Sequence, residues 1–361
     1  MLDVAIWNPR VGMETAGGTE TFLRNLSAEL QQREDTRATV YTHEGQDVPY
    51  ELETVFTGDI RTLPKEHTLN KALARHTPLL DAEIESVVSW CRGMLNRQFS
   101  DFDHDVLSTH YYLDAILLSR SVDIPTVFRL PGIKQESPRW DALWCYSDCS
   151  EYISNSPTTT ERVQEWYNRE LAGPVYAGVD TERFSPVGLR PENTILYVGR
   201  LGKGKGIKQL VRAAHHLCND YTVRIVGDGP LSDWAAEHKS ANTELVGTVP
   251  HSRIHEEYQN ATVTVLPTVH EAFPVTVIES LACGTPVIAS DIDATRLTID
   301  DGETGFLLQD REPKTIANAV QAACKCYHLQ GQARQQGPRV AREYSWQEQA
   351  NKYRQLLLDQ I

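Results

Sequence analysis

The sequence predicts an α/β protein that contains two doubly wound domains, each a parallel sheet covered by helices. Short apolar runs rich in β-branched residues alternate with helical patterns along nearly the whole chain. This alternation occurs as two successive series, and the stretch Val179–Asn193, with two prolines and a glycine, separates them. The 361 residues are enough for two domains of ordinary size. In sheets of this kind, ligands bind at the carboxyl ends of the strands.

The first series occupies residues 1–186. Its expected strands are, in chain order, Asp3–Trp7, Ala38–Thr42, Asp105–Thr109, Pro125–Leu130, Tyr152–Ser154 and Pro174–Tyr176. Helical patterns lie between them, notably Glu20–Arg33 and Ala82–Gln98.

The second series occupies residues 187–344. Its expected strands are Thr194–Val198, Thr222–Val226, Glu244–Val246, Thr262–Leu266, Val287–Ala289 and Gly305–Leu308. The helices expected between them include Ile207–Leu217, His251–Asn260 and Val275–Cys283, and the chain is helical after residue 312. The last helix, residues 345–361, has no strand to follow, so we expect it to cross back to the first domain.

Composition and charge exclude several classes of protein. The net charge is −14, with 29 acidic and 17 basic residues in residues 1–186 but 20 and 18 in residues 187–361. Nucleic acid is therefore not an expected partner, and only the second domain is electrostatically suited to an anionic ligand. No apolar run approaches the roughly 20 residues of a membrane span. Because the opening MLDVAIWNPR looks like a strand rather than a signal peptide, we expect a cytoplasmic protein.

One segment of the first half departs from the pattern. Residues 62–80 (TLPKEHTLNKALARHTPLL) combine three basic residues with leucines in an otherwise acidic region. Two hypotheses stay open: a loop with a short helix, or a segment that faces an acceptor or the membrane surface.

Residues Gly199–Gly206 read GRLGKGKG and lie between an expected strand and an expected helix. They miss the P-loop pattern G-x-x-x-x-G-K-[ST] at the last position, where Gly206 replaces the hydroxyl that holds magnesium. Arg200 and Lys205 remain, and they could bind a diphosphate without a metal. The alternative is an exposed basic loop. We interpret the missing hydroxyl as a sign that no metal is needed there.

Two glutamates lie eight residues apart in Thr268–Asp291. Glu271 precedes a predicted helix start, and Glu279 lies about one turn inside that helix. The helix start offers N–H groups to a phosphate, and carboxylates accept hydrogen bonds from vicinal hydroxyls such as those of ribose or a sugar ring. The alternative is a solvated helix start with acidic residues that suit the helix dipole.

Two features of the first domain are also candidates. Gly17 and Gly18 lie between the first strand and the first helix, where backbone can approach a ligand closely. A tight turn capped by Thr19 explains them equally well. His110 ends a buried-looking strand, where α/β domains place working residues, although a lone histidine is more often structural.

Together these motifs resemble the retaining glycosyltransferases of family 4, which have the GT-B architecture of two Rossmann-like domains that face a central cleft. The resemblance covers essentially the whole chain. GRLGKGKG resembles the family's Arg-and-Lys diphosphate loop, and EAFPVTVIE resembles its E-x7-E signature. GVDTERFSP is similar to the segment leading into the second domain, and GDGPL to the nucleotide-side loop. AGGTE is similar to the first-domain glycine loop, and His110 also matches the family pattern.

The resemblance implies a role for each residue of the second domain. Arg200 and Lys205 would stabilise the departing diphosphate in place of a metal. Glu279 would hold the ribose, and Glu271 the hydroxyls of the donor sugar. Backbone N–H groups of three neighbouring residues would bind phosphate and sugar: Phe273, Val275 and Thr276.

In the first domain, the resemblance places Gly17 and Gly18 against the phosphates or the acceptor, and His110 against the sugar ring. No residue is an obvious covalent nucleophile, so retention is expected to proceed by front-face attack. The chain departs from the family pattern at Ala272 and Pro274, where the family often has glycine. Pro274 has no N–H to donate, which leaves the identity of the donor sugar open.

The resemblance therefore implies an enzyme of glycan biosynthesis that needs neither a metal nor another cofactor. It would transfer a hexose-type sugar from UDP or GDP to a glycan, lipid-linked or small-molecule acceptor. The enzyme would be cytoplasmic, or peripheral at the inner face of the membrane if residues 62–80 contact lipid. The alternative enzymes of the same fold are a nucleotide-sugar epimerase and a sugar phosphorylase that needs pyridoxal phosphate. An alternative of a different class is a non-catalytic sugar-nucleotide-binding protein. A P-loop ATPase is disfavoured by Gly206.

Overall fold

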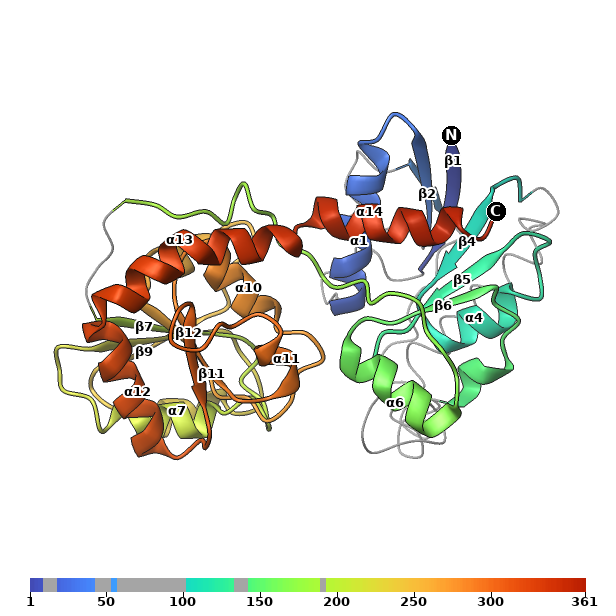
Figure 1. Ribbon diagram of the computed structural model, residues 1–361. Helices are drawn as coiled ribbons and strands as arrows, with labels where there is room; N and C mark the ends of the chain where they lie inside the picture. Colours follow the sequence, from blue (N-terminus) through green and yellow to red (C-terminus); the bar gives the residue numbers. More distant parts are fainter. Residues whose placement is uncertain (9–17, 43–52, 57–101, 133–141, 189–192) are drawn as a thin grey trace. The chain divides into compact units, whose positions relative to one another are not determined.

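The computed structural model describes residues 1–8, 18–42, 53–56, 102–132, 142–188 and 193–361. The chain forms two compact units: residues 1–176 with 349–361, and residues 177–348 (Figure 1). The predicted helix Ala82–Gln98, the segment 62–80 and Gly17 lie outside the described residues.

The sheet of the first unit has six parallel strands in the order β3-β2-β1-β4-β5-β6. They are β1 Leu2–Trp7, β2 Thr36–Thr42, β3 Glu53–Phe56, β4 Val106–Thr109, β5 Thr126–Arg129 and β6 Glu151–Ile153. The sequence did not predict β3, because four residues are too few to show a periodicity. The predicted strand Pro174–Tyr176 is wrong. In this part of the chain, Ala172 makes an isolated bridge to Ile153 and no strand follows, because Pro174 has no N–H to donate to a ladder.

Helices on both faces bury the apolar side chains of this sheet. They are α1 Gly18–Gln31, α4 Tyr112–Leu118, the 3-10 helix η1 Ala142–Tyr146 and α6 Pro157–Tyr167. One cluster joins α4, η1 and α6 to β5 and β6 through Tyr112, Phe128, Trp144, Tyr152 and Val163. The helix α6 begins after Ser156, whose side chain accepts a hydrogen bond from the N–H of Thr159, and Pro157 occupies the first turn.

The second unit contains a six-stranded parallel sheet in the order β12-β11-β10-β7-β8-β9. Its strands are β7 Thr194–Val198, β8 Thr222–Val226, β9 Thr243–Gly247, β10 Val263–Leu266, β11 Val287–Ser290 and β12 Gly305–Leu308. All six were predicted to within one residue at each end, because the apolar runs are bounded by Gly, Pro and polar residues.

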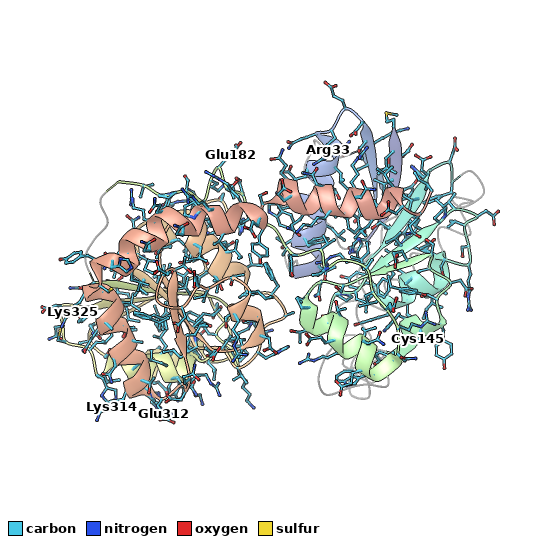
Figure 2. The ribbon with its side chains drawn as sticks, in the orientation of Figure 1. Arg33, Cys145, Glu182, Glu312, Lys314 and Lys325 are labelled. Atoms are coloured by element: carbon cyan, nitrogen blue, oxygen red, sulfur yellow. The ribbon has the colours of Figure 1, made fainter. Side chains whose placement is uncertain are left out.

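Helices cover both faces of the second sheet. They are α7 Ile207–Ala214, α8 Ser232–His238, α9 Ile254–Gln259, α10 Val275–Ala282, α11 Asp293–Arg296, α12 Pro313–Lys325 and α13 Tyr327–Glu343. Alternation along β7 decides the faces: Ile195 and Tyr197 pack with α7 and α12, whereas Leu196 packs with α9, α10 and α13. Lys314 and Lys325 of α12, and Glu312 directly before this helix, are exposed charged residues (Figure 2).

The last helix, α14 Trp346–Leu358, starts in the second unit and continues into the first. Buried Gln349 accepts a hydrogen bond from the N–H of Tyr176 at 2.9 Å. Tyr353 bonds to Ser108, and Arg354 pairs with Asp35 at 2.6 Å. The end of the chain therefore packs on the first unit. The units divide at residues 176 and 348, whereas the sequence suggested 186 and 344.

Each sheet has one place where the strand order reverses: between β1 and β4 in the first unit, and between β7 and β10 in the second. The loops that follow these strands on the carboxyl edge are the expected ligand sites of such a fold. Residues 199–206 follow β7, and residues 267–274 follow β10, so both predicted donor motifs meet at one switch point. Within the described residues, no helix is long and apolar enough to cross a membrane.

Candidate active site

The loop Gly199–Gly206 is held by the carboxyl end of the second sheet. Its first N–H, on Gly199, donates to Val226, and that of Leu201 donates to Asp228. The buried Tyr197 hydroxyl donates to the carbonyl of Arg200 at 3.1 Å. The Arg200 side chain is exposed, and among the described residues none pairs with its guanidinium. The loop thus presents two exposed cations, Arg200 and Lys203, for which the described residues offer no partner.

Gly206 begins α7 with φ 73°, a conformation that disfavours any side chain. A Cβ there would also lie 1.9 Å from the carbonyl oxygen of Pro267. The serine or threonine of a P-loop cannot fit in this position without moving the loop that follows β10. The contact with Pro267 gives a steric reason for glycine at this position. It does not test whether a metal is needed, so metal independence stays a prediction.

The GDGPL segment packs against the same loop through its glycines. A Cβ on Gly227 would lie 2.0 Å from the Gly199 carbonyl oxygen, and one on Gly229 would lie 2.7 Å from that of Leu201. Both glycines have positive φ. The motif is therefore required for close backbone packing beside the loop, which places the carboxyl ends of β7 and β8 together.

Lys205 and Glu271 form an ion pair, with Nζ and Oε1 2.5 Å apart. The sequence assigned these residues to different parts of a donor, and the structure brings them into contact. Glu271 is the more buried partner, with 17% of its side chain exposed against 35% for Lys205. Burial, followed by the charge of Glu271, raises the pKa of the neighbouring Tyr197 phenol, which therefore stays protonated.

The start of α10 uses several of its own donors. The N–H of Val275 donates to Phe273 at 3.1 Å, and those of Val277 and Ile278 donate to Pro274 at 2.9 and 3.4 Å. Among the described residues, none accepts a hydrogen bond from the N–H of Thr276. Of the predicted phosphate donors on this helix, Thr276 is thus the one that this structure leaves open.

Glu279 lies on α10 with 6% of its surface exposed. Its Oε2 accepts a hydrogen bond from the hydroxyl of buried Tyr258 at 2.7 Å, and Oε1 is 3.3 Å from Nε2 of His251. Burial and the charge of Glu279 hold the pKa of Tyr258 well above its ordinary value, so the phenol remains a donor. Sequence reasoning missed His251 and Tyr258, since no motif marks them and only the packing of α9 on α10 brings them to Glu279.

His110 lies in the first unit, directly after β4, and is fully buried. Its Nε2 is 2.8 Å from the Ser108 hydroxyl, which is 2.5 Å from the hydroxyl of Tyr353 on α14. Burial and the positive charge of Arg129 hold the pKa of His110 well below its ordinary value, so the imidazole is neutral. Gly18 begins α1 in the same unit.

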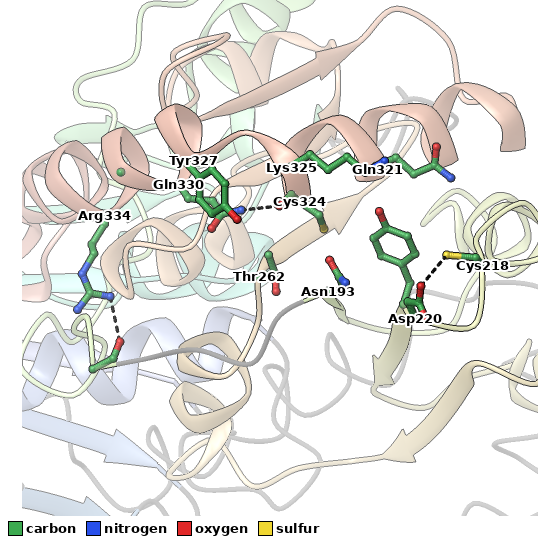
Figure 3. A pocket seen from close by; sticks show the side chains of 13 residues that line it. Asn193, Cys218, Asp220, Thr262, Gln321, Cys324, Lys325, Tyr327, Gln330 and Arg334 are labelled. Atoms are coloured by element: carbon green, nitrogen blue, oxygen red, sulfur yellow. Dashed lines mark hydrogen bonds between the residues drawn. The ribbon is translucent and has the colours of Figure 1, made fainter.

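A cavity of about 960 Å³ in the second unit lies at the opposite edge of its sheet (Figure 3). Asn193, Tyr221 and Thr262 line it, and each directly precedes a strand, so the cavity borders the amino ends of β7, β8 and β10. Parallel sheets bind substrates at the carboxyl ends. The cavity therefore does not coincide with the residues described above.

Two family models match the chain. The description "Glycosyltransferase Family 4" matches residues 16–183, and "Glycosyl transferases group 1" matches residues 179–340. Together they cover both units almost from end to end. The two matches overlap at residues 179–183, in the segment that leads into the second unit.

Curated relatives and solved structures are similar over most of the chain. A D-inositol 3-phosphate glycosyltransferase of Thermobifida fusca is 25% identical over 86% of this chain and 81% of its own. A glycogen synthase of Mycobacterium tuberculosis is 26% identical over 71% and 67%. The fold matches that of sucrose-phosphate synthase from Thermosynechococcus elongatus (TM-score 0.79, 20% identity, 99% of each chain). It also matches Anabaena Alr3699/HepE in complex with UDP and glucose (TM-score 0.75, 15% identity, 100% of each chain).

The glycines of the loop give a stability prediction with an internal control. Gly204 and Gly206 both have positive φ, but a Cβ on Gly204 meets nothing within 4 Å. We expect Gly204→Ala to lower the free energy of unfolding by about 1–2 kcal/mol from backbone strain alone. Gly206→Ala should cost roughly 1–3 kcal/mol more because of the clash with Pro267. Chemical denaturation of the two variants measures the difference. Equal losses would mean that the two loops do not pack as described.

Proposed function

Since the chain belongs to the GT-B glycosyltransferases of family 4 and group 1, we propose that it transfers a hexose-type sugar from UDP or GDP to an acceptor. The acceptor would be a glycan, a lipid-linked saccharide or a small molecule. Retention of the anomeric configuration and independence of a metal are parts of this proposal.

The observation that carries the proposal is the Lys205–Glu271 pair at the switch point between β7 and β10. A carboxylate for sugar hydroxyls, a lysine for phosphate oxygens and the exposed Arg200 lie on two loops that contact each other. The N–H of Val269 and the hydroxyl of Thr268 both donate to the carbonyl of Gly204, which joins these loops. A diphosphate linked to a sugar needs this combination of charges.

In the proposed reaction, an acceptor hydroxyl attacks the anomeric carbon as the bond to the diphosphate oxygen breaks. The acceptor's proton passes to an oxygen of the departing diphosphate on the same face. Arg200 and Lys205 stabilise the negative charge that develops there. Once Lys205 engages phosphate, Glu271 is released from its ion pair to accept hydrogen bonds from the sugar. The open N–H of Thr276 would add one donor to the phosphate.

Glu279 would accept hydrogen bonds from the ribose hydroxyls. Tyr258 holds one of its oxygens, and the other lies beside the half-exposed ring of His251. A nucleoside would thus meet a buried carboxylate whose orientation is already set, which lowers the ordering cost of binding. Structural neighbours support a uridine nucleotide, since Anabaena HepE is solved with UDP and glucose and with UDP-glucose.

Substitution of Lys205 tests the diphosphate site, with Lys203 of the same loop as a matched control. Lys205→Ala should slow transfer by roughly 10²–10³-fold, because it removes a cation from the departing diphosphate. It should also weaken binding of the nucleoside diphosphate about tenfold or more. Lys203 is exposed and has no predicted role, so Lys203→Ala should change both within about threefold. Steady-state kinetics and calorimetric titration measure these effects. Unchanged affinity in Lys205→Ala would remove the diphosphate assignment.

Glu271→Gln separates the ion pair from sugar recognition. If Glu271 binds the donor sugar, this variant should bind the free nucleoside diphosphate at least as tightly as the wild type, because Lys205 is freed. Its transfer rate should fall by roughly 10²-fold. Weaker binding of the nucleoside diphosphate, at an unchanged transfer rate from saturating donor, would show that Glu271 only positions Lys205.

Chelation tests the metal-free part of the proposal. A thermal-shift panel of UDP-, GDP-, ADP- and dTDP-sugars first identifies the preferred donor. With that donor, the transfer rate in the presence of EDTA should be at least about half of the rate without EDTA. A strict requirement for added magnesium would contradict it. Conversion of the donor without any acceptor would instead favour an epimerase.

A further inference from the structure

Arg129, the last residue of β5, is a buried cation whose contacts with the described residues include no carboxylate. It is 4% exposed. Its Nε and Nη2 both donate to the carbonyl of Val175, at 3.2 and 2.8 Å, and its Cζ lies 3.6 Å above the ring of Phe22. Two of the five N–H groups of a guanidinium are thus used. Among the described residues, none accepts a hydrogen bond from the other three.

No carboxylate within the described parts of the chain pairs with Arg129. Burial lowers its pKa to about 10, so the guanidinium is still charged at neutral pH. A backbone carbonyl and an aromatic face orient a guanidinium but do not neutralise it. Buried charges in proteins are normally paired, because an unpaired one costs several kcal/mol.

The side chains around Arg129 supply donors rather than acids. His110 is neutral and lies near the same Phe22 ring, with centroids 6.2 Å apart. Its Nδ1 is buried, and no described residue bonds to it. Tyr353, whose ring is 6.3 Å from that of His110, has its pKa raised to about 12 by burial and remains a neutral phenol.

The hydrogen-bond chain to His110 indicates which nitrogen carries its proton. The positive charge of Arg129 favours an orientation of the Tyr353 hydroxyl in which the oxygen lone pairs face Arg129. In this orientation the hydroxyl donates its hydrogen bond to Ser108. Ser108 then donates to Nε2 of His110, which places the proton on Nδ1. The unpartnered nitrogen is therefore a second donor on the edge where β4 and β5 end.

We propose that Arg129 and the Nδ1–H of His110 form a subsite for one phosphate or carboxylate group of the acceptor. The inference rests on the proposed transferase function and names the acceptor class. A guanidinium matches the paired oxygens of either group. The place is also the ligand-binding one, since both residues lie at the carboxyl edge of the first sheet beside its switch point.

This subsite must be compatible with the acidic first domain. Residues 1–186 contain 29 acidic and 17 basic residues, and for this reason the sequence predicts that only the second domain suits an anionic ligand. A single anionic group, however, needs only one local cation. The buried position also makes the attraction less sensitive to salt than a surface contact. The acceptor would therefore carry one anionic group on an otherwise neutral polyhydroxyl body.

The test measures binding of inorganic phosphate, hexose 6-phosphate and unmodified hexose to the full chain by calorimetric titration. The wild type should bind the hexose 6-phosphate more tightly than the hexose. Arg129→Gln should weaken phosphate and hexose 6-phosphate about 10–100-fold, the effect of one charge-assisted contact. Arg120, an exposed arginine of the same unit paired with Asp148, is the matched control, and Arg120→Gln should bind as the wild type does.

Arg129→Lys controls for misfolding. It keeps the positive charge but lacks the paired N–H groups of the guanidinium, so it should recover part of the affinity lost in Arg129→Gln. Binding to phosphatidylcholine vesicles with and without phosphatidic acid distinguishes a lipid headgroup from a soluble phosphate. Loss of acidic-vesicle binding in Arg129→Gln supports the same subsite with a lipid acceptor. If the wild type binds none of these phosphates, or if Arg129→Gln binds them equally well, the inference is wrong.

The affinity for UDP, measured on the same samples, keeps this result separate from the proposed function. Its binding residues lie in the other unit, so UDP affinity should not change in Arg129→Gln. Normal UDP binding without phosphate binding overturns the subsite alone. Loss of transfer from every nucleotide sugar would overturn the function itself.

Discussion

The carbonyl oxygen of Pro267 occupies the place where a side chain at residue 206 would lie, and the arrangement of the loops after β7 and β10 depends on this contact. Because residue 206 is glycine, the loop after β7 can lie directly on the loop after β10. The hydroxyl of Thr268 and the N–H of Val269 then both donate hydrogen bonds to the carbonyl of Gly204. Lys205 is thereby held 2.5 Å from Glu271. A close backbone contact, rather than an attraction between side chains, therefore determines the positions of the charged groups in the site.

The cations of the two units differ in burial, and we propose an anionic ligand for each unit. In the second unit the cations Arg200 and Lys205 lie near the surface, and the buried carboxylate of Glu279 is satisfied by Tyr258. In the first unit the cation itself is buried, and the neighbouring histidine is neutral. A surface cation can follow a diphosphate as it departs, whereas a buried one is already oriented for a group that stays in place.

Much of the fold could be predicted, and the failures have identifiable causes. Every strand of the second unit was expected, since each is an apolar run between turn residues. The strand β3 was too short to be recognised, and Pro174 removed the donor that a strand at residues 174–176 would need. In the site, Arg200, Lys205, Glu271 and Glu279 lie within motifs of fixed spacing. Arg129, His251 and Tyr258 lie in no motif, because their significance comes from neighbours distant in the chain.

The sequence by itself determined the class of the protein. Periodicity, turn residues and the spacing of a few charged groups are local properties, and they are sufficient to predict two doubly wound sheets and their loops. Only the tertiary structure decided which charges meet. It paired Lys205 with Glu271, gave Gly206 a steric reason, and buried Arg129 with no counterion among the described residues. These outcomes depend on distances between residues far apart in the chain, and on burial, which no local pattern of residues encodes.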